Sequence, residues 1–292
     1  MMEAKKLVRV LQCVGVLSVW CGAVVVSAQP ADPSSAVAHA LVSRVEQDPA
    51  ALSALRGYAK EGYREAQFPL AVLYHEGRAG LSQDATEAVY WFRKAAEQGH
   101  AVAQFNLAVM LQHGQGTNQD QAEAASWYRK AANQGDAAAQ CALGVMLLKG
   151  EGVASHPTEA VAWFRKAADQ HHALAQYNLG QRYLDGRGTP KNDQEAVLWL
   201  RKAAAQGVSA AVSQLAQLYD VGQGVTASPV LAYALYNLAA ASGDAFSAKR
   251  RDELAKNMLR PTLDKAQALT QALAAPKQFN TALDAYVKQA NS

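Results

Sequence analysis

Four Gly-x-Gly turns recur along the chain, and glycine-rich turns can bind phosphate through their backbone N–H groups. They are Gly114/Gly116, Gly150/Gly152, Gly186/Gly188 and Gly222/Gly224. None is followed by the Gly-Lys-Ser/Thr sequence with which a phosphate-binding loop holds the terminal phosphates and their metal ion. We therefore interpret the turns as structural, because glycine readily adopts the left-handed conformation that a tight reversal requires.

Arg-Lys pairs recur in the same way, and stacked repeats would align them into a basic ladder that could bind a polyanion. The pairs stand at 93/94, 129/130, 165/166 and 201/202. The formal net charge is only +3, and the first nine residues contribute +2 of it (three basic residues against Glu3), which leaves +1 downstream. Because acidic residues are interleaved, a solvated helix face is favoured and no nucleic-acid partner is expected.

Residues that could hold a metal or attack a substrate are sparse. The seven histidines contain no i, i+4 pair, and no Cys-x-x-Cys motif is present. Cys141 occupies the register of Phe105 and Tyr177, which indicates a packing role. The sequence contains no Gly-x-Ser-x-Gly, Ser-x-x-Lys or His-Glu-x-x-His. We predict no metal, no cofactor and no catalytic activity.

A 36-residue period sets the spacing of these residues. Nearly identical phrases begin at Trp91, Trp127, Trp163 and Trp199, and they read WFRKAAEQG, WYRKAANQG, WFRKAADQH and WLRKAAAQG. A fixed period of this length predicts stacked repeats. Five repeats are expected, over 63–99, 100–135, 136–171, 172–207 and 208–243, and the first holds one extra residue in its Gly77-Arg78-Ala79-Gly80 turn.

Each repeat is predicted to contain two antiparallel helices. In 100–135, the first helix carries Ala103, Leu107 and Leu111 on one face and ends before Gly114. The second begins near Asp120, which has capping-box spacing to Glu123. Asp84 and Asn192 repeat this cap and His156 is a poorer version, while Gly99, Gly135, Gly207 and Gly243 end second helices and His171 replaces that glycine once. A strained turn is expected at His171.

Segments of different character flank the repeats. Residues 29–62 are expected to form an N-terminal helical cap, with a degenerate second helix over 54–62. Residues 244–292 are expected to form a C-terminal helical cap, whose last helices span roughly 262–274 and 278–290. Arg251 stands where earlier repeats have leucine, as expected where no further repeat stacks.

The first 28 residues have the pattern of a secretory signal peptide. Three basic residues precede an apolar run over 10–26, and Val26-Ser27-Ala28 supplies small residues before a cleavage site. We predict cleavage after Ala28, a periplasmic or secreted protein, and no stable membrane insertion thereafter; an uncleaved anchor is the alternative. A lipid anchor at Cys21 is disfavoured by bulky Trp20 beside it. The mature chain would keep only Cys141, so it must fold without an internal disulfide.

The repeated phrases resemble those of the Sel-one-like repeat family, relatives of the tetratricopeptide repeat. The likeness covers about 63–243 and is explicit in AQFNLA at 103–108, AQCALG at 139–144 and AQYNLG at 175–180. The resemblance implies an all-α fold, a right-handed α-solenoid of stacked antiparallel helix pairs that binds other proteins. A cysteine-rich branch of the family is linked to β-lactam binding, but this chain lacks the cysteine pairs of that branch.

In tetratricopeptide-like stacks the first helices line the concave side, which makes their outward positions candidate binding residues. Pairs spaced i, i+4 on those helices would align into a groove, apolar towards the N-terminus and polar towards the C-terminus. They are Phe68 and Val72, Phe105 and Val109, Cys141 and Val145, Tyr177 and Gln181, and Ser213 and Gln217. The alternative is that these side chains belong to the core, because periodicity alone does not show which face is open.

Three functional hypotheses follow from the sequence. The first is an exported, monomeric adaptor that binds a protein or peptide in this groove. The second is an envelope enzyme acting on peptidoglycan or β-lactams. The third is a virulence factor that engages a host receptor.

Overall fold

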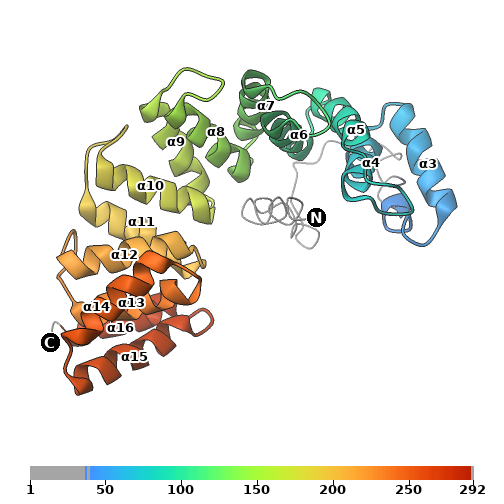
Figure 1. Ribbon diagram of the computed structural model, residues 1–292. Helices are drawn as coiled ribbons and strands as arrows, with labels where there is room; N and C mark the ends of the chain where they lie inside the picture. The colour runs from blue at the N-terminus through green and yellow to red at the C-terminus, as the bar shows by residue number, and fades with distance from the viewer. Residues whose placement is uncertain (1–36, 38–39, 291–292) are drawn as a thin grey trace. The chain divides into compact units, whose positions relative to one another are not determined.

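The computed structural model describes residue 37 and residues 40–290, and every regular element longer than a turn in that part is an α-helix (Figure 1). The predicted signal peptide lies outside the described residues. The helices are α3 (Pro49–Lys60), α4 (Arg64–Glu76), α5 (Ala85–Glu97), α6 (Ala101–His113), α7 (Gln121–Asn133), α8 (Ala137–Lys149), α9 (Pro157–Asp169), α10 (Ala173–Asp185), α11 (Asp193–Ala205), α12 (Ser209–Val221), α13 (Pro229–Ala241), α14 (Ala245–Lys256), α15 (Arg260–Ala274) and α16 (Phe279–Ala290). The all-α prediction is confirmed.

The chain divides into two compact units, which we call the N-terminal unit (residues 1–155) and the C-terminal unit (residues 156–292). In the N-terminal unit, α4 pairs with α5 and α6 with α7, while α3 packs on α4 and α8 on α7. In the C-terminal unit, α10 pairs with α11 and α12 with α13, and α9 packs on α10. Within each unit the repeated pairs stack side by side, as in an α-solenoid.

Capping residues begin the second helices where the sequence placed them. The carboxylate of Asp84 accepts from the backbone N–H groups of Thr86 and Glu87, and Asp120 accepts from Glu123 at 2.8 Å. Asn192 caps α11 in the same way, whereas His156 makes no side-chain cap. The capping-box glutamates do not return to the cap. Three of them accept from an indole instead: Trp91 Nε1 donates to Glu87, Trp127 to Glu123 and Trp163 to Glu159.

The repeated tryptophans are buried, and a lysine covers three of them. Trp127 is 7% exposed, and Lys130 Nζ lies 3.6 Å from its ring centroid. Lys166 and Lys202 lie over Trp163 and Trp199 at 4.0 and 3.9 Å. Each lysine thus places its ammonium over an aromatic face while the residue stays exposed to solvent.

A buried glutamine joins successive repeats. Gln104 is 4% exposed; its Nε2 donates to Ala96 O at 3.0 Å, and its Oε1 accepts from Gln134 Nε2 at 2.7 Å. The first contact reaches the end of α5 and the second the end of α7. Equivalent buried glutamines donate to the same kind of carbonyl at Gln67, Gln140 and Gln176.

Replacing Gln104 by leucine is expected to lower the free energy of unfolding by about 1–3 kcal/mol, because it removes both hydrogen bonds that this buried side chain makes between repeats. Urea unfolding followed by circular dichroism measures the loss. The control is Asn133→Ala at an exposed position of α7, which should cost less than about 1 kcal/mol. Equal losses in the two variants would contradict a role for the buried amide.

The turn in which His171 stands in place of glycine is left-handed, as expected. His171 has φ +62°, while Gly135 and Gly207 have φ +94° and +85° at the same position. A non-glycine residue is disfavoured in this conformation, so the third repeat ends in a strained turn.

Two histidines cap first helices with neutral rings. His100 Nδ1 accepts from Ala103 N at 3.1 Å, and His172 Nδ1 accepts from Ala175 N at 3.2 Å. His100 also stacks on Phe68 with the ring centroids 4.4 Å apart. Burial, assisted by the charge of Arg64, lowers the pKa of His100 to about 4. Burial lowers the pKa of His172 as well.

These caps predict acid sensitivity. In the unfolded chain His100 titrates near ~6.5, so between that pH and about 4 the unfolded chain binds a proton that the folded chain does not. Its contribution to stability is complete above ~6.5 and is lost as the pH falls, by about 2 kcal/mol at a pH of about 5. His100→Asn keeps an acceptor that does not titrate. Its urea midpoint should therefore fall less with acidification, and parallel pH profiles for variant and parent would contradict this role.

The C-terminal helices pair differently from the repeats. Both α14 and α15 pack on α13, and α16 contacts α15 and α11. Pro261 stands in the first turn of α15, whereas the sequence indicated that it precedes this helix. At the other end, α3 begins at Pro49, five residues before the expected start. Arg251, in the core-leucine register, contacts Asn237 and Asp252.

Candidate protein-binding surface

We call the outward side of α4, α6 and α8 in the N-terminal unit, and of α10, α12 and α14 in the C-terminal unit, the first-helix face. In the N-terminal unit its first register is largely covered. Phe68 is half-buried between Phe92 and His100, and Phe105 is 3% exposed against Tyr128, with ring centroids 5.6 Å apart. Cys141 is buried too. The second register stays more open: Val72 and Val145 are half-buried and Val109 is buried.

In the C-terminal unit the predicted residues form a connected polar surface. Gln181 Nε2 donates to Tyr177 Oη at 3.0 Å and to Gln214 Oε1 at 3.1 Å. Tyr177, Gln181 and Gln217 are half-buried, whereas Ser213 is 8% exposed. Gln214 was not among the predicted residues, although it follows Ser213 directly.

A hollow of about 440 Å³ opens on this face, and we call it the serine hollow. Its main lining residues come from α10, α12 and the turn before α14: Tyr177, Ser209, Ser213, Gln217, Ser242 and Asp244. The structure thus brings three predicted positions to one site. The other lining residues were not predicted. For Ser242 the available signal was a departure from the repeat, because it stands where Gln206 and Gln134 stand in other repeats, whereas Asp244 shares its register with Asp136.

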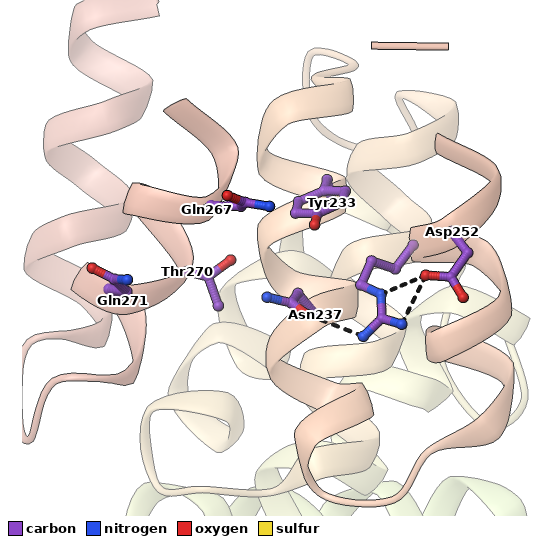
Figure 2. A pocket seen from close by; sticks show the side chains of 7 residues that line it. Tyr233, Asn237, Asp252, Gln267, Thr270 and Gln271 are labelled. Carbon is purple, nitrogen blue, oxygen red and sulfur yellow. Dashed lines mark hydrogen bonds and ion pairs between the residues drawn. The ribbon is translucent and has the colours of Figure 1, made fainter. Parts of the chain in front are cut away.

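A second hollow of about 490 Å³ lies between α13, α14 and α15 (Figure 2). The Arg251 guanidinium donates to the side chains of Asp252 and Asn237. Gln267, Thr270 and Gln271 line the opposite side on α15. The charge of Arg251 is therefore compensated, and this hollow offers mainly amides and hydroxyls.

The Arg-Lys ladder is occupied by internal contacts. Arg93 pairs with Glu123, Arg165 donates to the Tyr183 hydroxyl, and Arg201 pairs with Asp284 of α16. Together with the lysines over the tryptophans, these contacts leave little free basic surface for a polyanion.

Two features are absent from the described part of the chain. Within residues 40–290 no helix combines the length and the apolar character needed to cross a membrane. The same part contains no group of three or more His, Cys, Asp or Glu side chains placed to hold a metal ion.

Stacked helix pairs with a repeated Gly-x-Gly turn define a class of protein, the α-solenoids built from tetratricopeptide-like repeats. The Sel1 repeat model matches residues 64–100, 101–136, 137–172, 173–208 and 209–244, each range starting one residue later than the sequence spacing indicated. The chain belongs to the Sel1 repeat family. Proteins of this family are generally scaffolds for interactions with other proteins, and the fold is typically non-catalytic.

Two solved structures illustrate the likeness. A Sel1 repeat protein from Oxalobacter formigenes is 31% identical with a TM-score of 0.64, over 75% of this chain and 65% of that protein. The protein c5321, a protective antigen present in uropathogenic Escherichia coli strains, is 29% identical with a TM-score of 0.57, over 86% of this chain and 63% of that protein. The chain thus spans less than two thirds of either. A comparison with curated proteins found no match.

Proposed function

We propose that the protein is an exported scaffold that binds a protein or peptide partner along the first-helix face. The observation that supports this most directly is the serine hollow, where Tyr177, Ser213 and Gln217 from two successive first helices meet at the surface. The N-terminal unit has open positions of its own on its first helices, the half-buried Val72 and Val145. Side chains that are partly open and rigidly mounted on helices suit protein recognition, because little side-chain entropy is lost on binding.

Affinity capture with matched surface variants tests the binding face. The test variant is Val72→Glu with Val145→Glu, which places charge on the first-helix face without touching a buried position. The control is Tyr90→Glu with Leu198→Glu, because both residues are 50% exposed on second helices. A partner captured by the parent and by the control, but lost with the test variant, is the expected result. A partner that both variants keep would place the binding surface outside the first-helix face of the N-terminal unit.

Export is part of the proposal and has its own test. Residues 1–28 supply the basic start, the apolar run and the small residues before a cleavage site. The chain purified from its own cell should have the intact mass of a protein whose first residue is Gln29. It should be found in the periplasm or the medium. A retained N-terminus in a membrane fraction would support the uncleaved anchor instead.

We further infer that the scaffold has no chemistry of its own, in keeping with the absence of nucleophile and zinc templates from the sequence. The enzyme alternative predicts that the purified protein turns over a chromogenic β-lactam or digests sacculi. If the purified protein shows either activity, and a single substitution in the protein abolishes it, the activity belongs to this chain and the scaffold proposal is overturned.

A host-contacting role is a second candidate, favoured by the likeness to the protective antigen from uropathogenic E. coli. It requires the first-helix face to be accessible from outside the cell. Antibody against the folded protein should then label intact cells, whereas a periplasmic scaffold would be labelled only after the outer membrane is opened.

A further inference from the structure

The serine hollow exists because the fifth repeat departs from the pattern of the others. Ser213 stands in the register of Phe105 and Tyr177, and Ser242 stands in the register of Gln206. Two large side chains are thus replaced by small hydroxyls next to each other in space. The result is an open, polar cavity at a point where the first, second and fourth repeats present a ring and an amide, and the third repeat presents Cys141 and an amide.

One carboxylate gives the serine hollow its charge. Asp244 caps α14 and accepts from Phe246 N at 3.2 Å and from the Ser247 hydroxyl at 2.6 Å, and Ser213 Oγ lies 2.9 Å from Ser247 Oγ. These hydroxyl hydrogen bonds lower the pKa of Asp244, so it is ionised at neutral pH. Asp244 makes no ion pair with any described residue.

The basic residues nearby are already paired. Arg250 forms ion pairs with Asp220 and Glu253, both at 2.6 Å. Lys249 Nζ lies 4.0 Å from Glu253. The charge of Asp244 in the serine hollow is therefore offset only in part, by the N-terminus of α14 that it caps, so the hollow favours cations over anions.

The remaining lining groups fit a cationic side chain. The hydroxyls of Ser209 and Ser242 and the amide oxygen of Gln217 can accept hydrogen bonds, and half-buried Tyr177 adds an aromatic ring. A guanidinium or ammonium needs this combination of acceptors and a carboxylate. We propose, on the basis of the proposed function, that the serine hollow binds an arginine or lysine side chain of the protein partner, with its cation against Asp244.

A pair of short peptides tests the proposal directly. The probes are acetyl-Ser-Gly-Arg-Gly-Ser-amide and the same peptide with citrulline, which keeps the shape of arginine but carries no charge. They are titrated into the full chain, and the amide resonances of Ser213, Asp244 and Ser247 are followed by NMR. The arginine peptide should shift these resonances and bind about two- to fivefold more tightly than the citrulline peptide, as expected for a partly exposed ion pair. Raising the salt to about 0.5 M should weaken it.

Two variants localise the effect. Asp244→Asn keeps an N-cap but removes the charge, and it should abolish the preference for arginine. Ser213→Tyr restores the bulk found at Tyr177 and should block both peptides. The control is Asp120→Asn, which changes a similar cap on a second helix and should leave binding unchanged. If Ser213→Tyr fails to fold, judged by its melting curve, the Asp244→Asn comparison decides alone.

The outcomes separate this inference from the proposed function. Equal binding of both peptides, arginine binding that survives Asp244→Asn, or no resonance shift at all would overturn the cation site. In each of those cases a partner lost with Val72→Glu and Val145→Glu would still support the scaffold. Spermidine that bound more tightly than the arginine peptide would identify a small polyamine as the occupant and overturn the commitment to a protein side chain.

Discussion

Gly152→Ala is expected to destabilise the protein by about 2–5 kcal/mol, although it adds a single methyl group. Gly152 has φ +68°, where an alanine costs about 1–2 kcal/mol. A Cβ there would also lie 2.2 Å from Gln121 O and 2.3 Å from its carbonyl carbon. Gln121 begins α7, so relief of this overlap must move helix backbone away from the turn, which costs about another 1–3 kcal/mol.

The chain supplies its own control for this experiment. Gly135 has φ +94°, and apart from its chain neighbours no atom lies within 4 Å of where an alanine Cβ would stand, so Gly135→Ala carries the conformational cost without the overlap. It should lose only about 1 kcal/mol. Urea unfolding gives both losses, and hydrogen exchange should show faster opening of α7 and α8 than of α4 in Gly152→Ala. Similar losses of unfolding free energy in the two variants would contradict a close contact between the turn at Gly152 and the start of α7.

This contact explains a motif that the sequence could place but not interpret fully. The second glycine of each Gly-x-Gly turn approaches the start of the preceding second helix: Gly116 meets Ala85, Gly188 meets Pro157 and Gly224 meets Asp193. The phosphate-loop alternative failed on sequence grounds alone. The reason for two glycines became visible only with the packing between repeats. The second glycine is needed because a side chain there would overlap the backbone of the preceding second helix, and not only because the turn requires it.

Local chemistry made the helices predictable. Cap residues and terminating glycines act within a few residues, and the 36-residue period repeats them along the chain. Asp120 and His171 therefore have the conformations that their sequence context indicated. The indole partner of Glu123 is local in the same sense, because residues four apart are neighbours on a helix. The partner of Gln104 was not predictable in this way. Periodicity says which positions are equivalent, but contact with a carbonyl of the preceding helix depends on three-dimensional packing.

The candidate site shows the same limit more sharply. Phe105, Tyr177 and Ser213 share one register, yet Phe105 is covered by Tyr128 whereas Tyr177 borders an open hollow. A small side chain in the next first helix does not explain the difference by itself, because Cys141 follows Phe105 as Ser213 follows Tyr177. What is particular to the hollow is that Ser242 also replaces the repeated glutamine. The sequence indicated that the face becomes more polar towards the C-terminus. It did not show that a loss of bulk there would open a cavity around Asp244.

The second large effect is expected at the repeated tryptophans. Trp127→Ala should lower the free energy of unfolding by about 3–5 kcal/mol, because it empties a buried site that is only 7% exposed. It also removes the hydrogen bond from Nε1 to Glu123 at 3.0 Å and the aromatic face under Lys130. Leu235 occupies this register in the fifth repeat, so the position requires apolar bulk more than it requires an indole.

Trp→Phe substitutions separate packing from polar contacts. Trp127→Phe keeps most of the ring but loses the bond to Glu123, for which about 1 kcal/mol is expected. Trp199 is also buried, but its Nε1 has no hydrogen-bond partner among the described residues, so Trp199→Phe relieves an unsatisfied donor and should cost less. Urea unfolding of the three variants gives the comparison. An unchanged midpoint for Trp127→Ala would refute the packing of the repeat, whereas equal losses for the two Trp→Phe variants would refute only the contribution of the indole hydrogen bond.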